Sequence, residues 1–257
     1  MCLAVPPTSR ATYKVLGGNW CFERVCENAL RMPSPGRRGE MIGSVFLAFR
    51  RFLPDRLVDY QHIQAEAIRK YADGRQFLTS NYIGWNHRFD HYILAEELDL
   101  AAWDNYISTG HLDPLRNGFM HDMARGFKRK NFWLMESQST NTDWSLVNNA
   151  LDRGEVRAMA WHAVGHGADA VSFWQWRRPL SGVEQYFGVL VGPDGRPNPV
   201  YQEIAAVGAD FAKAGDALAG TTPDSTVALL HDYSSRWAVD YALRPGWGRR
   251  RALRWPP

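Results

Sequence analysis

Strand-like and helix-like segments alternate over residues 76–220, and this alternation limits the possible folds more than any other feature of the chain. The predicted strands are short, rich in aromatic and β-branched residues, and each is followed by a stretch with helical spacing. We place the strands at residues 76–83, 99–106, 131–136 and 169–176, and the helices in a short stretch after the first strand and at 118–130, 153–166 and 200–218. A further helix precedes the first strand, and we expect it to begin at Pro54-Asp55 and to end at Gly74. This pattern predicts an α/β fold with parallel strands and right-handed crossovers.

Two architectures have this order, an open doubly wound sheet and a closed (β/α)8 barrel. A doubly wound nucleotide-binding domain needs a glycine-rich turn after its first strand. The nearest match, GHGADA at residues 165–170, lies between a helix and a strand, which is the wrong order, and we interpret it as the end of a helix. In a barrel, the chemistry lies at the carboxyl ends of the strands. The predicted strands do end in polar or aromatic residues, namely Asn81, Asp104 to Tyr106, Glu136 and Trp174 to Trp176.

Tryptophan is frequent near these strand ends. Trp85, Trp103, Trp133, Trp144, Trp174 and Trp176 all lie in the same regions. Flat aromatic side chains bind sugars because the C–H face of a pyranose packs against them while its hydroxyl groups bond to polar neighbours. Packing in the core is the alternative for each single tryptophan.

Charge divides the chain into a body and two ends, although the formal net charge is only +3. Basic side chains outnumber acidic ones in residues 1–51, and residues 241–257 contain arginine but no acid. The part between them is acidic and contains every histidine, whereas all three cysteines fall in the first part. No run of 18 apolar residues is present, and the first residues do not resemble a signal peptide, so we expect a cytoplasmic protein without a membrane segment.

The motifs in the body resemble glycoside hydrolase family 42, the β-galactosidase family. The sequence FWLMESQ at 132–138, Trp144 after it, and GADAVSFWQWRRPLSGVEQYFG at 167–188 carry the resemblance, and TSN at 79–81, WDNY at 103–106 and GPDGRPNPVYQE at 192–203 agree in order and spacing. The resemblance implies a partial (β/α)8 TIM barrel, strands 5–8 with their helices. It runs from about Phe52 to about Leu243.

The same resemblance gives the expected domain map. Residues 52–222 are half of the catalytic barrel, and 223–243 are the start of a truncated α/β trimerisation domain, since VALLHDYSSRWAVD at 227–240 resembles its first strand and turn. Residues 1–51 are an atypical, unassigned segment, and 244–257 are a basic tail. The family forms homotrimers, and the shortness of the last domain counts against a trimer here.

Residue roles carry over position by position. The resemblance makes Glu136 the catalytic nucleophile, and a carboxylate that ends an apolar strand independently points to a polar site. Trp144 matches a residue that lines the sugar subsite, Glu184 a carboxylate that binds galactose hydroxyl groups, and Tyr106 a tyrosine near the nucleophile. Asn81 and Trp174, at two strand ends, complete the predicted substrate-binding set. Phe187 stands where the family has a sugar-binding histidine.

The resemblance implies retaining hydrolysis of terminal β-D-galactosides, which requires a second carboxylate as acid/base. In the family this glutamate follows an asparagine, and no Asn-Glu dipeptide occurs in the sequence. We therefore find no acid/base in the chain and expect a fragment with little or no activity. The alternative is a galactoside-binding relic without catalysis.

Other functions have weaker support. His162 and His166, like His87 and His91, have the spacing of a metal-binding helix face but lack the glutamate of HExxH, and Cys21 and Cys26 have no second pair, so we expect no metal site and no cofactor. The tail at 244–257 combines arginine and tryptophan, as nucleic-acid-binding arms do, but a solvated tail or translation out of frame explains it equally. We expect no nucleic-acid partner.

Overall fold

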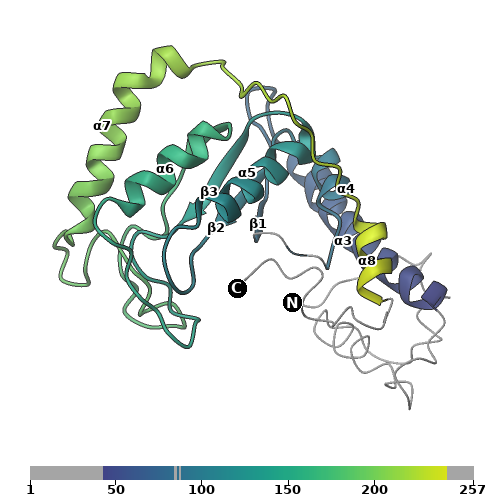
Figure 1. Ribbon diagram of the computed structural model, residues 1–257, viewed down its shortest axis with the longest axis horizontal. Helices are drawn as coiled ribbons and strands as arrows, with labels where there is room; N and C mark the ends of the chain where they lie inside the picture. Colours follow the sequence, from purple (N-terminus) through teal and green to yellow (C-terminus); the bar gives the residue numbers. More distant parts are fainter. Residues whose placement is uncertain (1–42, 84–85, 87, 242–257) are drawn as a thin grey trace. The chain divides into compact units, whose positions relative to one another are not determined.

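The computed structural model describes residues 43–83, 86 and 88–241 (Figure 1). The cysteines, the basic tail at 244–257, Trp85, His87 and most of the segment 1–51 lie outside the described residues. Two compact units divide the described chain: residues 43–64 with 232–241, and residues 65–231. The second unit contains all the predicted site residues.

A four-stranded parallel sheet forms the centre of the second unit. Its strands are β1 (Asn81–Ile83), β2 (Ala102–Asn105), β3 (Phe132–Ser137) and β4 (Ala168–Val171), and they lie side by side in chain order. The parallel sheet predicted from the alternation is therefore confirmed. Strand β3 has the predicted length, shifted by one residue, whereas β1, β2 and β4 are shorter than predicted because only part of each segment pairs with a neighbouring strand.

Helices follow the strands as α4 (His91–Glu96), α5 (Pro114–Lys128), α6 (Glu155–Gly165) and α7 (Val200–Leu218). Each helix contacts the next one along the chain, and α5 and α6 also contact strands (Figure 1). The strands are adjacent in the sheet in the same order as in the chain. When each connection between such strands is a right-handed crossover, every helix lies on the same face of the sheet. This single layer is the arrangement of a (β/α)8 barrel, whereas a doubly wound sheet has helices on both faces.

The core of this unit lies between the sheet and the helices. Phe132 and Leu134 of β3 have no exposed surface, and Met159, Ala160 and Ala163 of α6 are buried with them. Burying large apolar side chains is the main favourable term in folding, at roughly 1.5–3 kcal/mol for each one fully buried. The described helices contain none that is long and apolar enough to cross a membrane.

Helix α5 begins earlier than the predicted residue 118. Asp113 precedes it, and its carboxylate accepts hydrogen bonds from the backbone N–H groups of Leu115 (3.0 Å) and Arg116 (3.1 Å). Pro114 occupies the first helical turn, where a missing N–H costs nothing. The predicted start lies four residues beyond the observed one because the first turn is polar and shows no apolar periodicity. The prediction for α7 at 200–218 is confirmed.

The first unit contains α3 (Gly43–Arg69), whose last residues belong to the second unit, and α8 (Tyr233–Tyr241). We predicted that Pro54 would begin a helix, which was wrong, because the helix already runs through Gly43 and Pro54 lies inside it. A proline inside a helix removes one backbone hydrogen bond, and the full burial of Pro54 offsets part of that cost. Residues 227–232 form no strand, and Asp232 instead precedes helix α8.

Candidate active site

An irregularity in β3 decides where the Glu136 side chain lies. Trp103 of β2 pairs with Leu134, but Asp104 pairs with Glu136, so β3 has one extra residue, Met135, at this point. Strict alternation would put Glu136 on the helix-covered face with Phe132 and Leu134. A bulge of this kind changes the direction of the side chains that follow it. Glu136 therefore shares the face of Asp104, which is the face without helices.

Four polar residues meet here: Asn81 at the start of β1, Asp104 of β2, Tyr106 directly after β2, and Glu136 near the end of β3. The Tyr106 hydroxyl group donates a hydrogen bond to Oε2 of Glu136 at 2.6 Å, and Nδ2 of Asn81 donates to Oε1 at 3.0 Å. The same Asn81 nitrogen donates to Oδ2 of Asp104, also at 3.0 Å. Glu136, Tyr106 and Asn81, which were predicted as site residues, are thus brought together. Asp104 was missed as a site residue, although it lies in the WDNY motif at a strand end.

The surroundings favour a proton on two of these groups. Burial raises the pKa of Asp104 to about 7, with a further contribution from the negative charge of Glu136 and an opposing one from the Asn81 hydrogen bond. Burial also raises the pKa of the Tyr106 hydroxyl group, and its hydrogen bond to Glu136 adds to this effect. Tyr106 therefore remains a hydrogen-bond donor to Glu136 at any ordinary pH.

Three aromatic rings line the site next to Glu136. Trp144 and Phe187 both contact Tyr106 edge to face, at centroid distances of 5.0 and 5.6 Å, and the Trp144 and Phe187 rings are 5.3 Å apart. Trp144 is 55% exposed, so its surface is available to a ligand. Phe187 has no exposed surface and packs behind the other two rings. It supports the aromatic wall formed by the Tyr106 and Trp144 rings and is not itself accessible to a ligand.

The other two predicted site residues lie in the chain after β4. Trp174 is half-buried, and its backbone N–H donates to the Ser137 carbonyl oxygen at 2.8 Å, one residue beyond Glu136. Glu184 is half-buried, and its carboxylate has no hydrogen bond among the described residues. Its negative charge makes a small contribution to the raised pKa of the Tyr106 hydroxyl group.

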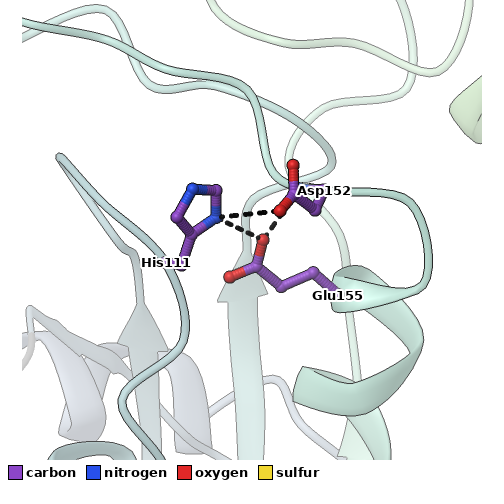
Figure 2. A group of neighbouring side chains, drawn as sticks. All are labelled: His111, Asp152 and Glu155. Carbon is purple, nitrogen blue, oxygen red and sulfur yellow. Dashed lines mark hydrogen bonds and ion pairs between the residues drawn. The ribbon is translucent and has the colours of Figure 1, made fainter.

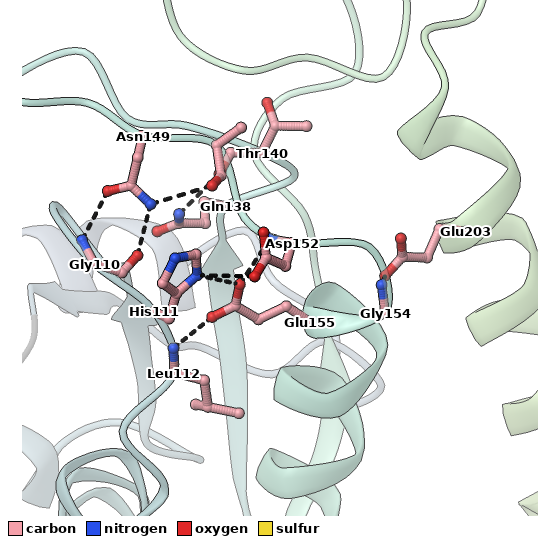
Figure 3. Close-up of polar contacts among 11 residues, drawn as sticks. Gly110, His111, Leu112, Gln138, Thr140, Asn149, Asp152, Gly154, Glu155 and Glu203 are labelled. Carbon is pink, nitrogen blue, oxygen red and sulfur yellow. Dashed lines mark hydrogen bonds and ion pairs between the residues drawn. The ribbon is translucent and has the colours of Figure 1, made fainter.

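The loops after β2 and β3 hold each other in place beside the site (Figure 3). Oε1 of Gln138, which is fully buried, accepts from the backbone N–H of Ile107, the residue after Tyr106. Asn149 exchanges two hydrogen bonds with the backbone of Gly110, both 2.7 Å long. These bonds fix the Tyr106 backbone relative to β3, so the distance between Tyr106 and Glu136 does not depend on their own hydrogen bond alone.

One group with three potential metal ligands occurs among the described residues, and it was not predicted. Nδ1 of His111 lies 2.9 Å from Oε2 of Glu155 and 3.7 Å from Oδ2 of Asp152 (Figure 2). Glu155 also accepts hydrogen bonds from the backbone N–H groups of Asp152 and Leu112. Every oxygen of Glu155 is therefore already bonded, and the group joins the loop after β2 to the start of α6.

The histidine pair singled out in the sequence has a different environment. Nδ1 of His166 lies 2.8 Å from an Asp122 oxygen, and the His162 and His166 rings pack at 4.6 Å beside the buried His121. The three rings are tilted relative to one another and pack between α5 and α6. They are not among the groups, within the part of the chain described, that bring three ligand atoms close together.

Known proteins with the same features are β-galactosidases. The model of glycoside hydrolase family 42, described as beta-galactosidase, matches residues 29–214. Beta-galactosidase BgaH of Haloferax lucentense is 37% identical over 217 residues, which is 78% of this chain and 32% of that protein. BgaA of a Thermus species is 32% identical over 220 residues, 79% of this chain and 33% of that protein. The chain thus spans about a third of the length of these relatives.

The chain is also similar to solved structures of β-galactosidases. The β-galactosidase of Halorubrum lacusprofundi superimposes with a TM-score of 0.73 at 34% identity, covering 81% of this chain and 32% of that one. The β-galactosidase of Bacillus circulans gives a TM-score of 0.72 at 29% identity, covering 76% of this chain and 29% of that one.

Proposed function

The chain belongs to glycoside hydrolase family 42, the β-galactosidase family, and from this membership we propose that it supplies the nucleophile side of a retaining active site for terminal β-D-galactosides. The observation that carries the proposal is the position of Glu136. It is the last but one residue of β3, and its carboxylate lies on the face without helices and accepts hydrogen bonds from Tyr106 and Asn81. A carboxylate held by two donors at the carboxyl end of a barrel strand is oriented for attack on a bound sugar.

The reaction proceeds in two steps. In the first, a Glu136 oxygen forms a bond to the anomeric carbon while the bond from that carbon to the leaving oxygen breaks, giving a covalent glycosyl-enzyme. In the second, water displaces Glu136 at the same carbon and restores the original configuration. Tyr106 keeps its proton and maintains its hydrogen bond to the carboxylate. Trp144 offers an exposed ring to the C–H face of the sugar, and Glu184 and Trp174 contact its hydroxyl groups and ring.

The first step also needs a proton on the leaving oxygen, and proton transfer of this kind contributes about 10²–10⁴-fold to the rate. Asp104 is the carboxyl group that shares a donor with Glu136, but it lies on the neighbouring strand beside the nucleophile. We therefore assign no acid/base among these residues. Galactosides with a poor leaving group should react slowly, whereas one whose leaving group needs no proton should still form the covalent bond.

A covalent trapping experiment tests the proposal. The probe is 2,4-dinitrophenyl 2-deoxy-2-fluoro-β-D-galactoside, since dinitrophenolate leaves without a proton and the fluorine atom slows the second step. We expect intact-mass spectrometry to show one added fluorogalactosyl group, and peptide mapping to place it on Glu136. Glu136→Gln should remain unlabelled. Glu96→Gln, which alters an exposed glutamate of α4, should label like the unchanged protein.

Two results would contradict the proposal: no labelling of a folded protein, or labelling at a residue other than Glu136. Calorimetry with galactose and glucose then separates the remaining possibilities. Specific binding of galactose without labelling would identify a sugar-binding protein that has lost the chemistry, with Trp144 and Glu184 as its ligand contacts.

A further inference from the structure

Two carboxyl groups share one amide group at the centre of the site. Asp104 and Glu136 are paired residues of adjacent parallel strands, and their side chains lie on the same face of the sheet. Nδ2 of Asn81 donates to both of them, at 3.0 Å each. Two ionised carboxylates at this spacing repel each other, so one proton is favoured on the pair.

The two members of the pair have unequal surroundings. Glu136 is half-buried and accepts from two donors, Tyr106 and Asn81. Asp104 is only 5% exposed, and among the residues that the structure describes Asn81 is its single side-chain donor. Its Oδ1 atom is buried without a hydrogen bond among the described residues. A buried carboxylate with few donors is the costlier one to ionise.

We propose that Asp104 is a positioning residue, which holds the shared proton of the pair and, through Asn81, keeps the Glu136 carboxylate aligned. The inference rests on the proposed role of Glu136 as nucleophile. Asn81 has two amide hydrogens, and one directed at each carboxyl group fixes the side chain between them. With Asp104 neutral, Glu136 carries the negative charge that attack on the sugar requires.

The charged groups around the pair support this division of roles. Burial is the main cause that raises the pKa of Asp104 to about 7, and the negative charge of Glu136 adds to it. The charges of Glu136, Asp104 and Glu184 all raise the pKa of the Tyr106 hydroxyl group. On the other face of β2, Trp103 packs against the neutral His121 of α5. Within the described chain, neither carboxylate has an ion pair with a lysine or arginine, so no cation compensates a second negative charge.

Carboxyl ¹³C NMR on protein labelled at aspartate tests the protonation directly and requires no activity. The resonance missing from Asp104→Asn identifies Asp104. We expect it to titrate near pH 7, and to titrate at lower pH in Glu136→Gln, because the neighbouring charge is then gone. Titration in the ordinary aspartate range would overturn the proposal, as would the absence of any change in Glu136→Gln. Circular dichroism checks that each variant is folded.

The trapping reaction tests the effect on Glu136. The trapping rate of the unchanged protein should show an inflection near pH 7, which Asp104→Asn should lack, because an amide does not ionise. Asn81→Ala should slow trapping by about a hundredfold, since loss of alignment by about 1 Å costs that much. Asn131→Ala is the matched control, because it removes an amide-to-carboxylate bond, 2.7 Å to Asp169, just before β3 starts.

The outcomes separate this inference from the function on which it rests. An inflection that persists in Asp104→Asn, or normal trapping by Asn81→Ala, would overturn the positioning role. If Asp104 titrates near pH 7 and shifts in Glu136→Gln but no variant is trapped, the proposed function is overturned while the shared proton is established.

Discussion

Single residues set the geometry of the site, and some of them carry no functional group. Gly188 follows Phe187 and lies directly against the loop after β3. A Cβ atom at this position would lie 1.9 Å from Oγ1 of Thr140 and 2.7 Å from the backbone nitrogen of Asn141. The Gly188 N–H donates to the Asn141 carbonyl oxygen at 2.9 Å. The close approach fixes Phe187, and with it the aromatic wall that includes Tyr106.

We predict that Gly188→Ala lowers the free energy of unfolding by about 1–3 kcal/mol, the usual cost of inserting a methyl group into a packed site. The neighbouring atoms belong to backbone and to a short side chain, which leaves little room to adjust. Urea unfolding followed by circular dichroism measures the change. The trapping rate should also fall, because the loop that carries Gln138 has to move.

Gly126→Ala is the control for this substitution. Gly126 lies in α5, and a Cβ atom there would have no neighbour within 4 Å. Alanine favours the helix over glycine by about 0.5–1 kcal/mol, so this variant should be more stable than the unchanged protein. If both variants changed stability equally, the contact with Thr140 would not be the cause.

At the scale of elements, capping and loop contacts decide where helices begin. Asp113 and Asp90 precede α5 and α4, and each carboxylate accepts hydrogen bonds from two backbone N–H groups of the first turn. Helix α6 has no side-chain cap, and Glu155 in its first turn instead pairs with His111. A negative charge at the start of a helix is favourable. The loops that surround the site are therefore anchored to helix starts.

Asp113→Ala should reduce the free energy of unfolding by about 1 kcal/mol, within the range of 0.5–2 known for lost caps. Two N–H groups at the start of α5 would lose their acceptor. Thermal and urea unfolding measure the effect. Asp113→Asn keeps an acceptor oxygen and should retain most of the stability, so an equal loss in both variants would count against a capping role.

For the molecule as a whole, the burial of histidines between the sheet and the helices links stability to pH. His121 of α5 has no exposed surface, stacks on Phe132, and has no hydrogen bond to either ring nitrogen among the described residues. Burial lowers its pKa from 6.5 to about 3, with further contributions from His162 and His166. The folded protein therefore keeps this ring neutral, whereas the unfolded chain binds a proton below pH 6.5.

The sign of the pH effect follows from this difference. The stability associated with a neutral His121 is fully present above pH 6.5 and is lost as the pH falls toward 3, at up to about 1.4 kcal/mol per pH unit. We predict that His121→Phe flattens the decline of unfolding free energy between pH 6.5 and 4. Urea unfolding at pH 7, 6, 5 and 4 gives the comparison.

His111→Gln provides the control for the pH experiment. The hydrogen bond to Glu155, followed by the charges of Glu155 and Asp152, raises the pKa of His111. The stability that protonated His111 contributes is fully present below its pKa in the unfolded chain. It is lost as the pH rises through its higher pKa in the folded protein. Removing it should leave the acid-side decline unchanged or make it steeper. A flatter decline in His111→Gln would show that His121 is not the dominant group.

The sequence by itself determined the parallel sheet, the order of its strands and the single layer of helices, because local alternation and right-handed crossovers allow little else. It also predicted Glu136, Tyr106 and Asn81 as site residues, from the resemblance and from their positions in apolar strands. The structure brings these three side chains together, although Asn81 begins β1 and does not end it. It did not give the start of α3 or α5, where a proline inside a helix and a polar first turn conceal the helical pattern.

Only the tertiary structure decided how the site is assembled. Alternation along β3 puts Glu136 on the face of Leu134, and the extra residue opposite β2 moves it to the face of Asp104. Asn81 is 55 residues from Glu136 in the chain, and only strand register places its amide between two carboxyl groups. Burial of Phe187 likewise depends on a loop 45 residues away, through Asn141 and Tyr186. Register, bulges and burial arise from contacts between distant segments, which local sequence patterns do not encode.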